Sequence, residues 1–139
     1  MSRINFFEAD AKYRLQDKKV LQNKIIQLID LEGFTLICLN IVVCSDNYLL
    51  EMNKTYLDHD YYTDILTFDQ SDKKMDVEGD LYISIDRIRE NATLNKCAIW
   101  IEFQRVAIHG ALHLVGYNDH NDKEKEIMRE KEGFYLSSS

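Results

Sequence analysis

The chain has 139 residues, of which 45% are hydrophobic and 29% charged, and this composition predicts an ordinary soluble globular protein. A chain of this length is expected to form a single domain, 1–139, that buries roughly two thirds of its unfolded surface. The net charge of −7 argues against broad nucleic-acid binding, which requires a basic face, but it leaves room for an enzyme with a local basic groove.

Targeting features are missing from the sequence. No apolar run approaches the roughly 20 residues of a transmembrane helix. The first residues lack the layout of a signal peptide, so we expect a cytoplasmic protein that does not act at a membrane. The cysteines Cys38, Cys44 and Cys97 are odd in number and form no C-x-x-C pair, so we expect neither a disulfide framework nor a cysteine zinc site.

Hydrophobic periodicity and capping residues predict strands that alternate with helices. Asp17 and Ser45 can each cap a helix, and Gly33 can end the first one. The polar stretch 70–77 is expected to be an exposed loop. Strands interrupted by helices in a chain this short predict a small α/β (α+β) layer structure. The predicted strands are 3–8, 35–44, 63–68 and 79–85, and the predicted helices are 17–31, 45–52, 86–95, 98–115 and 122–132.

Four of the five predicted helices have residues that are expected to face the core. They follow the spacing of one helical face, with polar residues opposite. These residues are Val20, Leu21, Ile25, Leu28 and Ile29 in the first helix, Tyr48, Leu49 and Met52 in the second, Ile99, Phe103, Val106, Ala107, Ala111, Leu112 and Leu114 in the fourth, and Ile127 and Met128 in the last.

The chemistry of the chain is concentrated at the end of the helix 98–115. His109 and His113 are four residues apart, so both imidazoles project from one helical face and can reach one metal ion. Gly116 ends the helix, and Asp119 or His120 can then supply a third ligand from the following loop. Three protein ligands leave a fourth tetrahedral position open, as in catalytic zinc sites. The alternative is a half-exposed histidine face without an ion.

A zinc peptidase mechanism is disfavoured by the residue between the two histidines. In the helical motif H-E-x-x-H the glutamate is the general base. Gly110 occupies that position here, so no protein base can be assigned with certainty. A bound zinc ion lowers the pKa of its water to about 7, and metal-bound water is therefore the expected nucleophile.

Four separated motifs follow one another along the chain. They are Met52-Asn53-Lys-Thr-Tyr56, Thr63-Asp-Ile-Leu-Thr-Phe68, Gly79-Asp-Leu-Tyr-Ile-Ser84 and His109-Gly-x-Leu-His113-Leu-x-Gly116-Tyr117. In order and spacing they resemble the motifs of the YbeY family of bacterial endoribonucleases. The similarity extends from about residue 40 to residue 132 and includes Glu102.

The resemblance implies a specific fold and function. The fold would be a mixed, mainly parallel sheet flanked by helices, with the metal site on a central helix and the loop after it. The protein would be a zinc-dependent, single-strand-specific endoribonuclease, holding one zinc ion or another divalent transition metal. It would act in small-subunit rRNA maturation and ribosome quality control. Its implied partners are rRNA in the small ribosomal subunit, a small-subunit ribosomal protein and an assembly GTPase.

The chain departs from the family at two positions. The family's third ligand is a histidine six residues after the second, a position held here by Asp119, with His120 one residue later. Met128 and Glu132 align with the family only if no gap is inserted before them, and this alignment favours Asp119 as the third ligand. A one-residue bulge in the loop would favour His120 instead. Leu57 stands where the family has an arginine that is implicated in activity. In this chain the role of that arginine is therefore either unfilled or taken by a residue elsewhere.

Several residues are candidates for supporting roles. Glu102 could orient a histidine or lie on the surface, and Arg105 could meet a phosphate or pair with Glu102. Asp64 could shape the site from the start of its strand or form a turn, and His59 is assigned no role. The candidate platforms for stacking of RNA bases are Tyr56, Tyr61, Tyr62 and Tyr117.

Two other functions remain open at this point. One is a zinc peptidase or amidase, which the helical histidines allow and Gly110 disfavours. The other is a non-catalytic ribosome-assembly protein, which the leucine at the family's arginine position makes worth testing. Nuclease assays with and without a chelator would separate the three functions.

Overall fold

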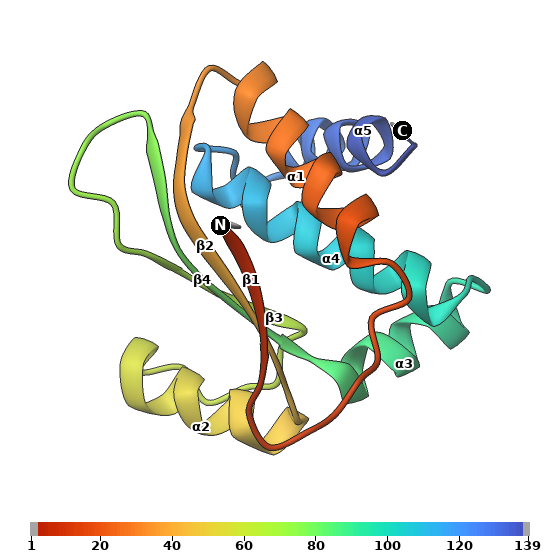
Figure 1. Ribbon diagram of the computed structural model, residues 1–139. Coiled ribbons are helices and arrows are strands. Elements are labelled where there is room, and N and C mark those ends of the chain that lie inside the picture. Colours follow the sequence, from red (N-terminus) through yellow and green to blue (C-terminus); the bar gives the residue numbers. More distant parts are fainter. Residues whose placement is uncertain (1–2, 138–139) are drawn as a thin grey trace.

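The computed structural model describes residues 3–137, and a four-stranded sheet lies at its centre (Figure 1). The strand order is β1-β2-β4-β3, with β1 and β4 parallel to β2 and β3 antiparallel to β4. This arrangement confirms the expected mixed, mainly parallel sheet. The strands are β1 (Ile4–Glu8), β2 (Thr35–Cys44), β3 (Ile65–Asp69) and β4 (Asp76–Ser84).

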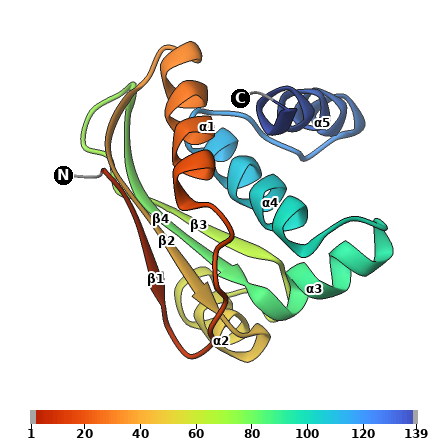
Figure 2. The same cartoon turned by 45° about the vertical axis from the view of Figure 1, so that its right-hand side comes forward.

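Helices cover the two faces of the sheet unequally. Within residues 3–137, one face carries α1, α3, α4 and α5, and the other carries only α2 (Figures 1 and 2). α4 lies between the sheet and α5, so most of its circumference is covered (Figure 2). The helices are α1 (Lys18–Leu31), α2 (Asp46–Leu57), α3 (Ile85–Leu94), α4 (Ile99–Leu114) and α5 (Asp122–Ser137).

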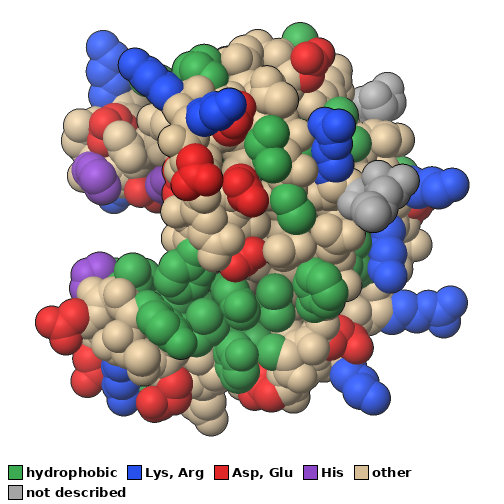
Figure 3. Space-filling model, turned by 60° about the vertical axis from the view of Figure 1, so that its left-hand side comes forward, with side chains coloured by type: hydrophobic (Ala, Val, Ile, Leu, Met, Phe, Trp, Pro, Cys, Tyr) green, Lys and Arg blue, Asp and Glu red, His purple; other side chains and the backbone are tan. Residues whose placement is uncertain are grey.

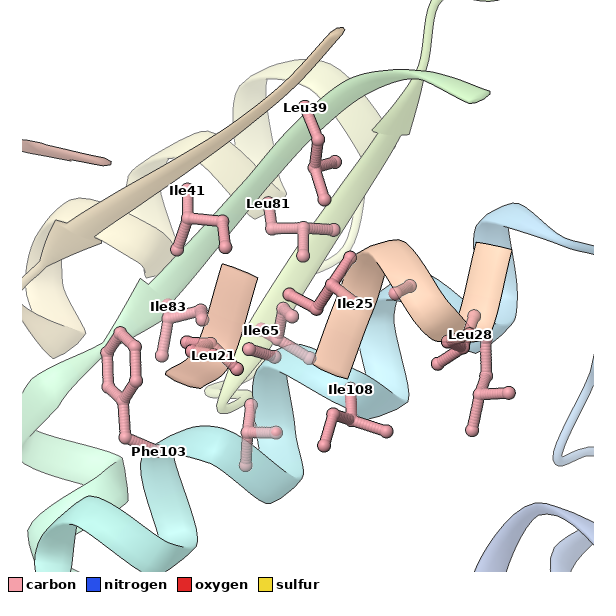
Figure 4. Packing of buried hydrophobic residues seen from close by; sticks show 14 of the residues in the cluster. Leu21, Ile25, Leu28, Leu39, Ile41, Ile65, Leu81, Ile83, Phe103 and Ile108 are labelled. Carbon is pink, nitrogen blue, oxygen red and sulfur yellow. The ribbon is translucent and has the colours of Figure 1, made fainter. Parts of the chain in front are cut away.

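The main hydrophobic core fills the space between the sheet and the helices α1 and α4 (Figure 4). Leu39 and Ile41 point from β2 to this side because alternate residues of a strand share a face. Phe103 and Ile108 meet them from α4, and both are fully buried. A largely buried helix therefore carries the two histidines, as predicted from the sequence.

Local capping signals explain where the first two helices begin. The carboxylate of Asp17 accepts a hydrogen bond from the backbone N–H of Val20 at 3.3 Å, and the hydroxyl of Ser45 accepts one from Tyr48 at 3.1 Å. Both caps were predicted, and each satisfies an otherwise free N–H of the first turn.

Three element boundaries differ from the prediction by three or more residues. α2 continues to Leu57 rather than Met52, and α5 continues to Ser137 rather than residue 132. β4 begins at Asp76, within the stretch predicted as a loop, because its first residues pair with Thr35 and the residues after it in β2. Backbone pairing does not require apolar side chains, so the polar residues of this stretch provide no signal for the extension.

Four residues expected to face the core are exposed instead. Val20, Tyr48, Ile99 and Ile127 each keep 37–38% of their surface accessible. Val20, Tyr48 and Ile99 lie in the first turn of their helices, and Ile127 lies next to the buried Met128 of α5. The periodicity therefore located the buried faces but not how far along each helix the packing extends.

All three cysteines are free thiols in the structure. Cys44 is buried, and burial, together with the nearby carboxylates of Asp10, Asp46 and Asp86, raises the pKa of its thiol to about 12. Such a thiol is protonated and inert at neutral pH. Among residues 3–137, no helix is both long enough and apolar enough to cross a membrane.

Candidate metal centre

A cavity of about 370 Å³ opens between the C-terminal end of α4 and the segment that joins α2 to β3. His109, His113 and Asp119 line one side of it, and His59 and Tyr61 belong to the connecting segment. Figure 3 shows a hollow in the surface with histidine side chains on both sides. The two sequence regions that carry the strongest motifs therefore meet in one place.

Three atoms that could bind a metal ion converge in this cavity. The Nε2 atoms of His109 and His113 are 3.0 Å apart, and the Oδ2 atom of Asp119 lies 3.4 Å from the first and 3.7 Å from the second. Four ligands at zinc–nitrogen and zinc–oxygen distances of about 2.0–2.1 Å lie roughly 3.4 Å from one another in a tetrahedron. The observed separations therefore fit one ion of this size.

The remaining ring nitrogens determine the chemistry of these atoms. His109 Nδ1 lies 2.6 Å from a carboxylate oxygen of Glu132, and His113 Nδ1 lies 2.9 Å from the backbone carbonyl oxygen of Tyr117. Both partners only accept, so each Nδ1 carries the proton and each Nε2 of a neutral ring has a lone pair. Two lone pairs and a carboxylate then face one another and repel. A shared cation or proton between them would remove this repulsion.

The turn after α4 places the loop that carries Asp119. The N–H of Gly116 donates to the carbonyl of His113 at 3.1 Å, and the N–H of Tyr117 donates to Leu112 at 3.0 Å. This pair of bonds is the Schellman motif, and it requires the left-handed conformation that Gly116 adopts with φ of 99°. The same turn aims the carbonyl of Tyr117 at His113.

The electrostatics of the two histidines differ. Burial and the neighbouring His109 lower the pKa of His113, which favours the neutral ring that metal coordination requires. Burial also disfavours the charged form of His109, but the hydrogen bond and charge of Glu132 outweigh it and raise the pKa of His109. A proton on His109 is therefore the natural competitor of a cation at this site.

Replacing Glu132 by glutamine is expected to lower the affinity for zinc roughly 10–100-fold, the usual effect of losing a carboxylate that orients a histidine ligand. The glutamine side chain would be neutral and would hold the ring of His109 less firmly. The measurement is chelator competition on purified protein. Glu130→Gln, an exposed residue of the same helix, is the matched control. Equal affinities for both variants would contradict the role of Glu132.

The remaining predicted site residues lie in different places. His120 is exposed, its backbone N–H donates to Glu124 at 3.0 Å, and it is not among the three converging ligands. Asp64 lines the cavity, where burial raises the pKa of its carboxyl and nearby His109 partly offsets this effect. Leu57 also lines the cavity, so the position of the family's arginine faces the site without a charge.

Glu102 and Arg105 form a separate pair away from the cavity. Glu102 is only 3% exposed and accepts hydrogen bonds from Asn95 at 3.2 Å and from the guanidinium of Arg105. Its bonds tie α4 to the end of α3, so it is neither a surface residue nor hydrogen-bonded to a histidine. Because Arg105 is engaged there and does not line the metal cavity, it is poorly placed to meet a phosphate at this site.

Only one of the four candidate tyrosines lines the cavity. Tyr61 does so, whereas Tyr56 packs edge-on against Phe68 outside it. The ring of Tyr62 lies under the guanidinium of Arg87, with 5.4 Å from its centre to the guanidinium carbon. The hydroxyl of Tyr117 donates to Glu32 at 2.6 Å and is anchored in a different cluster.

Gly110 faces the sheet rather than the cavity. A Cβ atom added to it would lie 2.6 Å from Ile65 Cδ1 and 2.9 Å from Leu81 Cδ2. Real Cβ atoms keep greater distances, so a side chain at this position would force the buried side chains of Ile65 and Leu81 to shift. The structure thus gives a packing reason for the residue that the sequence identified only as a missing base.

Two important residues were not identified from the sequence. Glu132 was used only as a marker of register, and Glu32 was not considered. Glu32 accepts hydrogen bonds from Tyr117, from Lys131 at 3.1 Å and from the Tyr135 hydroxyl, joining α1, the site loop and α5. Burial raises the pKa of Glu32, but these three donors outweigh it and lower the pKa overall. Both carboxylates meet partners far away in the chain, for which no local pattern exists.

Comparison with known proteins places this geometry in context. The family model described as Endoribonuclease YbeY matches residues 4–139. The protein named Endoribonuclease YbeY from Cytophaga hutchinsonii is 47% identical over 134 residues, covering 96% of this chain and 94% of its own. The protein of the same name from Amoebophilus asiaticus is 41% identical, covering 97% and 92%.

A solved structure resembles the fold over nearly the whole chain. The solution structure of TM1509 from Thermotoga maritima superposes with a TM-score of 0.64 at 28% sequence identity. The match covers 96% of this chain and 86% of that protein. The arrangement of sheet and helices is therefore shared with a protein of known structure.

Proposed function

The chain belongs to the YbeY endoribonuclease family, and from this premise we propose that it is a zinc-dependent enzyme that hydrolyses phosphodiester bonds of single-stranded RNA. The observation that carries the metal dependence is the convergence of two imidazole lone pairs and one carboxylate oxygen within 3.0–3.7 Å. His109, His113 and Asp119 would hold the ion.

The residues of the chain would have distinct roles at this site. When bound, zinc would supply a Lewis acid and a source of hydroxide at neutral pH. Glu132 and the carbonyl of Tyr117 accept from the Nδ1 atoms of His109 and His113. They thereby favour the neutral tautomer in which each Nε2 is free to bind a metal. No lysine or arginine is among the described residues that line the cavity, so the ion would provide the main positive charge for a phosphate.

The biological setting is part of the proposal. Membership of the family supports RNA as the substrate class, and the resemblance of the motifs supports small-subunit rRNA in the cytoplasm. It also supports action with a small-subunit ribosomal protein and an assembly GTPase in ribosome quality control. A net charge of −7 is consistent with a chain that meets RNA through a local site rather than a broad basic face.

The alternative functions have less support. A peptidase that follows the H-E-x-x-H mechanism needs a glutamate where Gly110 packs against the sheet, and a side chain there would displace Ile65 and Leu81. A purely structural metal would be expected to have four protein ligands, whereas three groups converge in the described part of the chain. An open position favours catalysis over the non-catalytic assembly role.

Cleavage assays on labelled RNA test the proposal. We expect zinc-loaded protein to cut a single-stranded RNA and to leave a fully paired hairpin stem intact. A chelator should reduce cleavage to background, and added zinc should restore it. The control substrate is an unstructured peptide, which should remain whole. RNA binding without cleavage in the loaded protein would support the assembly role instead, and peptide hydrolysis would support the peptidase.

A further inference from the structure

The segment between α2 and β3 presents two stacked aromatic rings, His59 and Tyr61, across the cavity from the metal-binding group. We propose that this pair is a stacking platform for one unpaired RNA base next to the bond that is cut. The inference rests on the proposed endoribonuclease function and assigns a substrate subsite within it.

The geometry of the pair suits base stacking. The ring centres are 5.2 Å apart with an angle of 22° between the planes, and the Tyr61 hydroxyl and His59 Nδ1 are 3.1 Å apart. Tyr61 keeps 55% of its surface exposed, so an aromatic side chain lies on the wall of an open polar cavity. A large exposed ring gains contact area when a flat base covers it.

The platform is held in place before any ligand binds. Asn53 is buried at the end of α2, and its carbonyl oxygen accepts the N–H of His59 at 3.1 Å. Its side-chain amide donates to the carbonyl of Tyr61 at 2.9 Å. One buried residue thus fixes the backbone on both sides of Asp60, which reduces the ordering cost of binding.

The surrounding charge selects a base rather than a phosphate. Asp58 and Asp60 flank His59, and Asp64 lies in the same cavity. Lys54, a cation of α2, is already shared between Asp60 at 3.6 Å and Glu51 at 3.7 Å. These carboxylates would repel a phosphate group, whereas stacking on the neutral face of a base does not require positive charge.

The subsite also gives a physical reason for single-strand preference. A base in a duplex is covered by its neighbours and cannot lie on a protein ring unless it is first unstacked. An unpaired base can occupy the platform while its sugar–phosphate backbone extends toward His109 and His113. The cavity that contains both groups has a volume of about 370 Å³, enough for one nucleotide rather than a helix.

The experiment compares Tyr61→Ala, Tyr61→Phe and Tyr62→Ala in the full chain. Tyr62 is the matched control because it is an adjacent exposed tyrosine whose ring contacts Arg87 outside the cavity. Affinity for a fluorescein-labelled single-stranded RNA is measured by anisotropy in the presence of a chelator, so that no cleavage occurs. A second RNA carries 2-aminopurine, whose emission falls when it stacks. Circular dichroism verifies that each variant is folded.

Tyr61→Ala is expected to weaken RNA binding at least fivefold, the factor that corresponds to about 1 kcal/mol of stacking. It should also restore the quenched 2-aminopurine emission. Tyr61→Phe keeps the ring and should remain within about twofold of the unaltered protein, as should Tyr62→Ala.

Equal weakening by Tyr61→Ala and Tyr62→Ala, or no weakening by either, would overturn the platform. If the unaltered protein still cuts RNA in that case, the proposed function survives without this subsite. If the unaltered protein neither binds nor cuts RNA, both proposals fail together.

Discussion

Alanine at His109, His113 or Asp119 is expected to lower the affinity for zinc by more than roughly 100-fold, beyond the effect of losing an orienting residue alone. Each change removes one of the three converging ligand atoms and leaves two, too few for a stable catalytic site. RNA cleavage should fall to background in all three variants. Metal content by elemental analysis and chelator competition are the two measurements.

His120→Ala is the matched control for this series. His120 is the exposed neighbour of Asp119, so its removal should leave both zinc affinity and cleavage within about twofold. A greater loss of zinc in His120→Ala than in Asp119→Ala would show that the loop after Gly116 bulges and that the histidine is the ligand. Unchanged zinc stoichiometry in both His109→Ala and His113→Ala would eliminate the site.

Gly110→Glu is expected to lower the free energy of unfolding by at least about 3 kcal/mol. The change would give the helix the H-E-x-x-H pattern, but the new side chain would begin 2.6 Å from Ile65 and 2.9 Å from Leu81. The carboxylate would then lie in the apolar space between α4 and the sheet without a partner. Urea unfolding followed by circular dichroism measures the loss.

Gly133→Glu provides the control for charge and helix propensity. Gly133 lies in α5, and a Cβ atom added to it meets no other atom within 4 Å. This variant should be as stable as the unaltered protein or more stable by up to about 1 kcal/mol, because glycine disfavours a helix interior. A Gly110→Glu variant that is equally stable and hydrolyses peptides would refute the packing argument and revive the peptidase hypothesis.

The sequence itself determined the features that depend on neighbours in the chain. Asp17 and Ser45 capped their helices as predicted, because capping joins residues three apart. The spacing of His109 and His113 placed both rings on one helical face, and their Nε2 atoms indeed approach to 3.0 Å. The α/β class followed from patterns along the chain, and the resemblance of its motifs implied the family and its mixed, mainly parallel sheet.

Family register along the chain also favoured Asp119 over His120, and the structure brings the carboxylate of Asp119 to the two imidazoles. The Schellman turn at Gly116 is a local motif that sets where this loop leaves the helix. Sequence spacing alone therefore favoured the residue whose carboxylate meets the two imidazoles, and the zinc affinities of Asp119→Ala and His120→Ala test whether it is the ligand.

Only the tertiary structure decided which side chains meet across the fold. Glu132 rather than Glu102 contacts His109, because α5 packs on α4 beside the histidines while Glu102 lies at the other end of the helix. Tyr61 rather than Tyr56 lines the cavity, since α2 continues to Leu57 before the chain turns. Helix periodicity specifies the face of a residue but not the element that packs against it, and this partner depends on how the whole core is filled.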